Sequence, residues 1–226
     1  MSKPEARVLI TAEEASPLDE LLRSRGMVPV HRPLSRTIVL HDPPPCALPG
    51  AVILSSARAA RLAPALQSWV GAAPVACVGE ATAQAARLRG LRPWHVGEAG
   101  ASAILSALEG APVPWVFVGA RAPAPAMRQA IERGEVLPWA VYDQEEQVLD
   151  ELPEVELVLL ASPSAARTWA RSGGGHLPVV VIGQTTASEA EACGLRIVGQ
   201  AARPGWSELA QAAAEVLQPR KNGPAS

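Results

Sequence analysis

The sequence predicts an α/β protein of two lobes, each a parallel β-sheet flanked by helices, joined by a two-stranded β linker. Short runs of Val, Ile and Leu alternate with helical stretches, the second half of the chain repeats the first, and two extended segments interrupt the rhythm at matching places. With 226 residues, the chain is long enough for two domains of about 100 residues each.

Buried strands are expected where a short run is apolar on both faces, as in the middle of a parallel sheet. These runs are Val8–Ile10, Val52–Leu54, Val75–Val78, Trp115–Val118, Leu157–Leu160 and Val179–Ile182. The first helix is predicted to be capped by Ser16, to carry Pro17 in its first turn and to end at Gly26.

An internal repeat with an offset near 105 residues relates the two halves of the chain. Alanine matches arise by chance in an Ala-rich sequence, so the other aligned residues carry the inference. They include Pro17 with Pro125, Gly26 with Gly134, Ser56 with Ser162, Gly79 with Gly183 and Thr82 with Thr186. Two copies of one βα unit explain this pattern most economically.

The extended segments 34–41 and 139–148 are expected to pair as the linker between the lobes. The first lobe is then discontinuous and comprises residues 1–33 and 149–218, and the second lobe comprises residues 42–138. Residues 219–226 are polar, contain Pro and Gly, and are expected to form a disordered tail.

Composition excludes several classes of protein. The net charge of −2 argues against an electrostatic nucleic-acid binder, which would carry a basic face. No apolar stretch approaches the ~20 residues of a membrane span, and the N-terminus does not resemble a signal peptide. The three cysteines form no Cys-x-x-Cys pair. We therefore expect a cytoplasmic protein that binds neither membranes nor nucleic acid. We also expect it to be a monomer.

No cofactor and no metal are expected. The four histidines and three cysteines lack the spacing of metal ligands. Neither the Gly-x-Gly-x-x-Gly nucleotide fingerprint nor a phosphate-binding P-loop is present.

Hydroxyl residues follow several of the predicted strands. Ser55-Ser56 and Ser162-Pro163-Ser164 each stand between a buried strand and a helix, at the carboxyl edge of a parallel sheet where ligands bind. Their free backbone N–H groups can receive a carboxylate, although simple helix capping explains the same residues. Gly79 to Thr82 and Gly183 to Thr186 form a second matched pair, for which a turn plus a cap is the alternative explanation.

The order of these motifs resembles the uroporphyrinogen-III synthase family. The resemblance rests on the serine motifs, on Val-Gly-x-x-Thr-Ala and Ile-Gly-x-Thr-Thr-Ala, and on Val141-Tyr142 after the Gly119-Ala120-Arg121 turn, and it covers Lys3 to Leu217. It implies two α/β lobes and a linear tetrapyrrole substrate, hydroxymethylbilane, which bears eight carboxylates. The implied reaction closes hydroxymethylbilane into a ring, with inversion of its last pyrrole and loss of water, and needs no cofactor.

The resemblance also implies a set of site residues. Tyr142 is the candidate catalytic group, placed to assist departure of the hydroxyl. The residues expected to bind substrate are Thr11, Ser55, Ser56, Thr82, Ser102, Arg121, Ser162, Ser164, Thr185 and Thr186.

One motif departs from the family pattern. Family members often continue the first strand with Thr-Arg-Pro, whereas Thr11 is followed here by Ala12 and Glu13. The cationic contact is either absent or supplied by Arg58 or Arg121. The alternative is a catalytically weak or inactive two-lobed protein that binds a small ligand, and supplying hydroxymethylbilane discriminates between the two.

Overall fold

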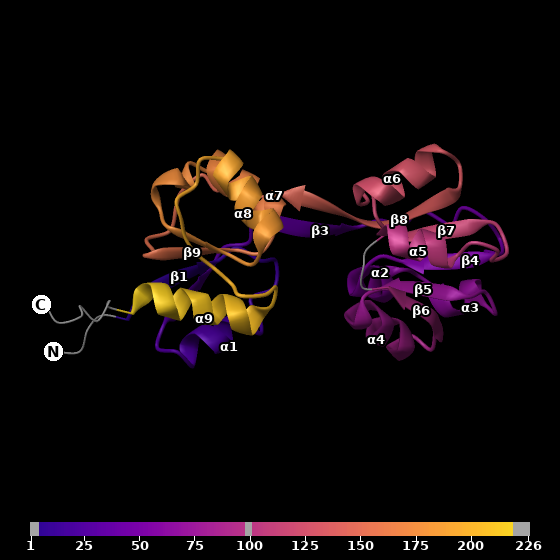
Figure 1. Ribbon diagram of the computed structural model, residues 1–226, viewed down its shortest axis with the longest axis horizontal. Coiled ribbons are helices and arrows are strands. Elements are labelled where there is room, and N and C mark those ends of the chain that lie inside the picture. The colour runs from indigo at the N-terminus through magenta and orange to yellow at the C-terminus, as the bar shows by residue number, and fades with distance from the viewer. Residues whose placement is uncertain (1–4, 98–100, 219–226) are drawn as a thin grey trace, which may run out of the picture. The chain divides into compact units, whose positions relative to one another are not determined.

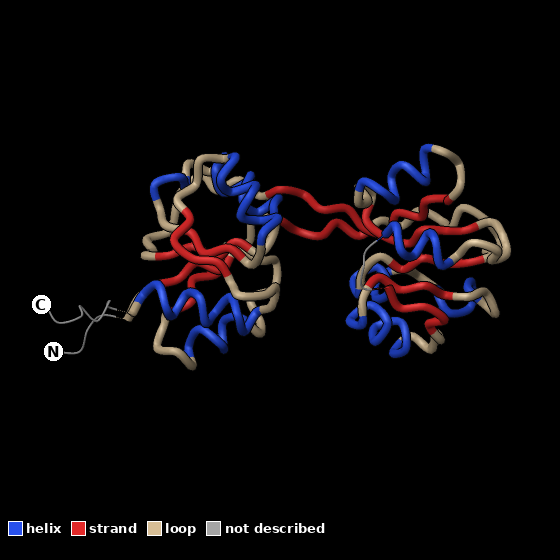
Figure 2. The backbone as a smooth tube through the Cα atoms, viewed as in Figure 1, coloured by secondary structure: helices blue, strands red, loops and turns tan. Residues whose placement is uncertain are grey.

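The computed structural model describes residues 5–97 and 101–218. The chain divides into two compact units, which are Met1–Arg36 with Glu145–Ser226 (unit 1) and Thr37–Gln144 (unit 2). Each unit contains a β-sheet with helices packed on it (Figures 1 and 2). The tail expected over residues 219–226 lies outside the described residues.

Unit 1 is built on a five-stranded parallel sheet in the order β11-β10-β9-β1-β2. Its strands are β1 (Arg7–Ile10), β2 (Val28–His31), β9 (Leu157–Leu160), β10 (Val179–Val181) and β11 (Ile197–Gln200). Helices α1 (Leu18–Arg23) and α9 (Trp206–Leu217) pack on one face. Helices α7 (Pro163–Arg171) and α8 (Gln184–Ala192) pack on the other, and a 3-10 turn, Gly174–His176, follows α7.

Unit 2 contributes most of a six-stranded sheet in the order β3-β8-β7-β4-β5-β6. The strands are β3 (Ser35–Val39), β4 (Ala51–Leu54), β5 (Val75–Val78), β6 (Pro93–Gly97), β7 (Trp115–Ala120) and β8 (Val136–Glu146). Helices α2 (Ala57–Leu62), α3 (Leu66–Val70) and α4 (Glu80–Leu88) pack on one face. Helices α5 (Ala101–Ala107) and α6 (Pro125–Glu132) pack on the opposite face.

The predicted fold class is confirmed. Both sheets are parallel except at β3, and β1 pairs with β9 from the last third of the chain. All six strands expected from apolar runs are present, because each run is buried on both faces. The repeat extends to the register: Arg7 pairs with Val28 in unit 1, and Trp115 pairs with Val136, 108 residues later, in unit 2.

The predicted cap of the first helix is wrong. Helix α1 begins one residue later than expected, so Pro17 occupies the N-cap position and no side chain caps the helix. Ser16 therefore lies outside the cap. The helix also ends earlier than predicted, at Arg23, and a turn continues to Gly26, which has a φ of +74° and whose N–H donates to the carbonyl of Arg23 at 3.0 Å.

Strands β3 and β8 pair with each other. The N–H of Leu40 donates to the carbonyl of Val141 at 3.0 Å, and the N–H of Gln147 donates to the carbonyl of Leu34 at 2.9 Å. Because β8 already starts at Val136 beside β7, one continuous strand serves both the sheet and this pair. The predicted linker bounds, 34–41 and 139–148, remain predictions.

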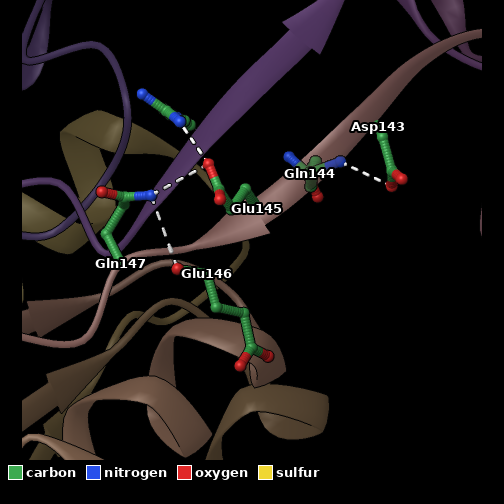
Figure 3. Close-up of polar contacts among 6 residues, drawn as sticks. Asp143, Gln144, Glu145, Glu146 and Gln147 are labelled. Carbon is green, nitrogen blue, oxygen red and sulfur yellow. Dashed lines mark hydrogen bonds and ion pairs between the residues drawn. The ribbon is translucent and has the colours of Figure 1, made fainter.

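Polar contacts accompany the end of β8. The guanidinium of Arg36 donates to the carboxylate of Glu145 at 2.6 Å, and the side-chain amide of Gln147 lies 3.4 Å from the same carboxylate (Figure 3). Glu146 forms an ion pair with Arg171 of α7. These pairs are exposed, so each contributes little to stability by itself.

No helix within residues 5–97 and 101–218 is both long enough and apolar enough to cross a membrane.

Candidate active site

The same serine cap opens a helix in both units. Ser56 precedes α2 with φ −159° and ψ 156°, and Ser162 precedes α7 with φ −158° and ψ 157°. Each side-chain oxygen accepts the N–H of the residue three positions later, Ala59 or Ala165, at 3.1 Å. The capping explanation therefore holds for both serines, and the first turn of each helix also presents N–H groups that an anion can use.

The two caps differ in their second partner. In unit 2 the hydroxyl of Ser56 lies 3.2 Å from the hydroxyl of Tyr142, and either oxygen can donate. In unit 1 the hydroxyl of Ser162 lies 3.0 Å from that of Ser164. The predicted catalytic tyrosine and one predicted substrate-binding serine are thus in contact.

A β-bulge directs Tyr142 toward Ser56. Gly119 pairs with Ala140 but Ala120 pairs with Tyr142, so Val141 is an extra residue on β8. Before the bulge, Pro138 and Ala140 line a cavity of about 420 Å³ on the α6 face. Regular alternation would put Tyr142 on that face, yet it packs with the α2–α4 core and is 8% exposed. Bulges near active sites re-aim side chains in this way.

Two arginines contact Tyr142, Arg58 through its side chain and Arg121 through its backbone. The guanidinium of Arg58, on α2, sits 5.6 Å from the centre of the Tyr142 ring. Arg121 pairs with Asp143 at 3.6 Å, and its backbone N–H donates to the carbonyl of Tyr142 at 2.9 Å. Because the Arg121 side chain is more than half exposed, it remains available to an anionic ligand.

Ser55 contacts the neighbouring strand at the carboxyl edge of unit 2. Its hydroxyl lies 3.4 Å from the carbonyl of Val118. A side chain at Gly119 would collide with that hydroxyl and with the ring of Phe117. Glycine at position 119 therefore makes room for the Ser55 hydroxyl, and packing explains why the Gly119-Ala120-Arg121 turn begins with glycine.

Thr11 occupies the equivalent edge in unit 1. It is almost completely buried, and its hydroxyl donates to the carbonyl of Leu159 at 2.6 Å. The hydroxyl proton is therefore already used inside the sheet. Residue 12 is alanine, whose carbonyl lies 2.8 Å from Nε2 of His31.

The remaining predicted residues differ in exposure. Thr82 and Thr186, each the third residue of its helix, are only 3% and 1% exposed. Thr185 is exposed on the first turn of α8, Ser164 is half-buried on α7, and Ser102 is exposed on α5. Helix first turns therefore offer the hydroxyls of Thr185 and Ser164 to a ligand more directly than those of Thr82 and Thr186.

Sequence reasoning did not identify the roles of Arg58, Asp143 and Gly119. The sequence offers Arg58 only as a substitute for a missing cation, whereas the structure places its guanidinium over the Tyr142 ring. No local signal in the sequence predicts this contact, because Arg58 and Tyr142 come from distant parts of the chain.

Within the described residues, no group of three or more His, Cys, Asp or Glu side chains could hold a metal ion. The side chains gathered at the carboxyl edge of unit 2 are hydroxyls, a phenol, two guanidiniums and the Asp143 carboxylate, which pairs with Arg121. The hydroxyls and guanidiniums can bind carboxylates, and Tyr142 can donate a proton or a hydrogen bond.

Comparisons with known proteins agree in fold and family. Residues 16–211 match the family model described as Uroporphyrinogen-III synthase HemD. The fold is similar to that of a mutant uroporphyrinogen III synthase from the extremely thermophilic bacterium Thermus thermophilus, with a TM-score of 0.65 and 16% identity over 94% of this chain and 98% of that chain. It is also similar to uroporphyrinogen-III synthetase from Helicobacter pylori, with a TM-score of 0.65, 14% identity, and coverage of 94% and 99%. No curated protein sequence matches this chain.

Proposed function

The chain belongs to the uroporphyrinogen-III synthase family, and we propose that it acts as a cyclising lyase whose chemical step is assisted by Tyr142. Family membership makes it a uroporphyrinogen-III synthase of tetrapyrrole biosynthesis. The residue assignments that follow are argued from its own geometry.

Substrate carboxylates are bound mainly by backbone N–H groups at helix starts. The first turns of α2 and α7 carry such groups beside Ser56 and Ser162, and no acidic residue lies in either first turn. A carboxylate at a helix N-terminus is favoured by the aligned peptide dipoles. This explains how a protein with a net charge of −2 can bind a polyanion. Arg121 supplies a side-chain cation in unit 2.

Tyr142 is the proposed proton donor to the departing hydroxyl. The carbon–oxygen bond of the hydroxymethyl group breaks with its electron pair on oxygen, which leaves as water with the phenol proton. Ring closure releases one proton from a pyrrole carbon, which restores the proton balance. The observation that supports this role is the contact of the Tyr142 hydroxyl with Ser56, beside the cationic Arg58. The electron-rich pyrrole assists ionisation, so positioning matters more than acid strength.

An isomer assay tests the function. Hydroxymethylbilane closes without inversion when no enzyme is present, so the purified protein should change the product to uroporphyrinogen III. The products are oxidised and separated by chromatography, with a boiled sample as control. Accumulation of only the non-inverted isomer would contradict the proposal. A cytoplasmic location and a monomeric state remain predictions, the second checked by light scattering of the purified protein.

A further inference from the structure

We propose that Ser56 and Arg58 are positioning residues that hold the Tyr142 phenol in one orientation, with the β8 bulge bringing the ring to them. The value of this arrangement for catalysis rests on the proposed function of Tyr142. The arrangement itself is a property of unit 2 and can be tested without substrate.

The bulge supplies the first element. With Val141 as the extra residue, Tyr142 leaves the α6 face that Pro138 and Ala140 occupy and reaches the N-terminal end of α2. The Tyr142 ring is buried among the core residues under α2 and α4, so packing restricts the side chain. Only the phenol hydroxyl then needs a hydrogen-bond partner.

Ser56 supplies the second element. Its oxygen accepts the N–H of Ala59, which fixes the side chain in one rotamer. A serine hydroxyl has one proton and two lone pairs, so after capping it still has a proton to donate. When Ser56 donates to the phenol oxygen, the Tyr142 proton is left free to point away from Ser56. That is the arrangement in which Tyr142 can donate to a substrate hydroxyl.

Arg58 supplies the third element. It stands in the first turn of α2, two residues after the cap, and its guanidinium lies 5.6 Å from the centre of the Tyr142 ring. A cation near an aromatic face attracts the ring quadrupole and favours one ring position. The same short segment, Ser56 to Arg58, therefore contacts both the hydroxyl and the ring.

Unit 1 provides a matched control. Ser162 caps α7 with the same backbone angles and the same 3.1 Å hydrogen bond, but its second partner is Ser164. The residue equivalent to Arg58 by the 106-residue offset is also Ser164. Removing the Ser162 hydroxyl therefore removes a cap of equal geometry without touching the tyrosine.

The experiment uses the fact that Tyr142 is the only tyrosine in the chain. Full-length protein labelled with tyrosine carrying carbon-13 at Cζ gives one resonance, whose chemical shift reports the hydrogen bond of the phenol oxygen. Ser56→Ala should move or broaden this resonance, and Ser56→Thr, which keeps a capping hydroxyl, should restore it. Arg58→Leu should move it, because the cation near the ring is lost. Ser162→Ala should leave it at the wild-type position.

Kinetics separate positioning from simple capping. Ser56→Ala should lower kcat by about tenfold, the effect of one lost hydrogen bond. In a Tyr142→Phe background the same change should lower kcat by less than about twofold, because Ser56 then has no phenol to hold. Equal losses in both backgrounds would overturn the positioning role.

The outcomes distinguish this inference from the proposed function. An unmoved Cζ resonance in a folded Ser56→Ala protein would refute positioning, whatever the activity of Tyr142→Phe. A moved resonance together with full activity of Tyr142→Phe would support positioning and refute the acid role of Tyr142. Circular dichroism of Ser56→Ala beside Ser162→Ala identifies any loss that comes only from an uncapped helix.

Discussion

The two copies of the repeat share a backbone but differ in the chemistry at their carboxyl edges. The serine caps of α2 and α7 agree to within a few degrees, yet only Ser56 meets a phenol. Two residues after the cap serine, unit 1 has Ser164 and unit 2 has Arg58. A duplicated scaffold has therefore kept one anion-binding geometry twice and carries the candidate proton donor once.

The central strands show an exchange of the same kind. In unit 2 a serine hydroxyl after β4 reaches the carbonyl of Val118, and Gly119 leaves space for it. In unit 1 the position equivalent to Ser55 is Ala161, and Thr11, equivalent to Gly119, donates to the carbonyl of Leu159. Each unit thus keeps one hydroxyl across its two central strands, supplied from opposite strands. Equivalent positions in the two units can therefore hold different side chains while a hydroxyl-to-carbonyl contact between the central strands is kept.

The largest difference between the two units should be the loss of kcat in Tyr142→Phe compared with the loss in Ser164→Ala. Loss of the phenol hydroxyl should lower kcat by up to about 100-fold, the lower end of the usual contribution of a general acid, because the electron-rich pyrrole assists ionisation. Loss of the Ser164 hydroxyl should lower it by about tenfold or less, since backbone N–H groups remain. Steady-state rates of the two folded variants decide this. Similar losses in both would remove the asymmetry between the units.

Gly119→Ala should destabilise the protein by about 1–3 kcal/mol, the range for overpacking a buried site. The new methyl group would meet the Ser55 hydroxyl and the Phe117 ring. Gly175→Ala is the control, because nothing lies within 4 Å of a Cβ at that position. Urea unfolding of both proteins measures the difference, and equal midpoints would show that Gly119 is not needed for space.

Introducing an aspartate at the start of α8 or of α4 tests which of the two helices binds a substrate carboxylate. Thr185→Asp should raise KM by about tenfold, because an aspartate in the first turn occupies the place of a substrate carboxylate. The equivalent change, Ala81→Asp, should have a smaller effect, since Glu80 already stands at the start of α4 and pairs with Arg87. Substrate titrations with both variants test this. A larger rise for Ala81→Asp would reverse the assignment.

The smallest effect concerns Cys77, whose equivalent in unit 1 is Val181. Burial raises the pKa of the Cys77 thiol from 9.0 to about 11. The folded state thus holds the proton more tightly than the unfolded state, so this contribution to stability is present below pH 9 and is lost as pH rises toward about 11. Cys77→Val should change stability at pH 7 by less than about 1.5 kcal/mol and should flatten the alkaline loss. Thermal unfolding from pH 7 to 11 would show whether the slope persists without the thiol.

The fold could be predicted to a large extent because its signals are local. Runs such as Leu157–Leu160 are apolar on both faces, and only the interior of a covered parallel sheet buries both. The cap at Ser56 was visible for the same reason, since it depends on residues within four positions. The predicted cap at Ser16 was wrong because the helix starts one residue later, and local sequence preferences do not fix a helix start to a single residue.

The sequence by itself determined the two sheets, the repeat and the serine and threonine positions at the strand ends, because burial and capping act over a few residues. Tertiary structure alone decided that Tyr142 meets Ser56, 86 residues away in the chain. One extra residue in β8 makes that contact, and a bulge leaves no mark in an extended run of hydrophobic residues. It also decided that Thr82 and Thr186 are buried while Thr185 is exposed, since helix packing against the sheet selects which face of a first turn reaches solvent.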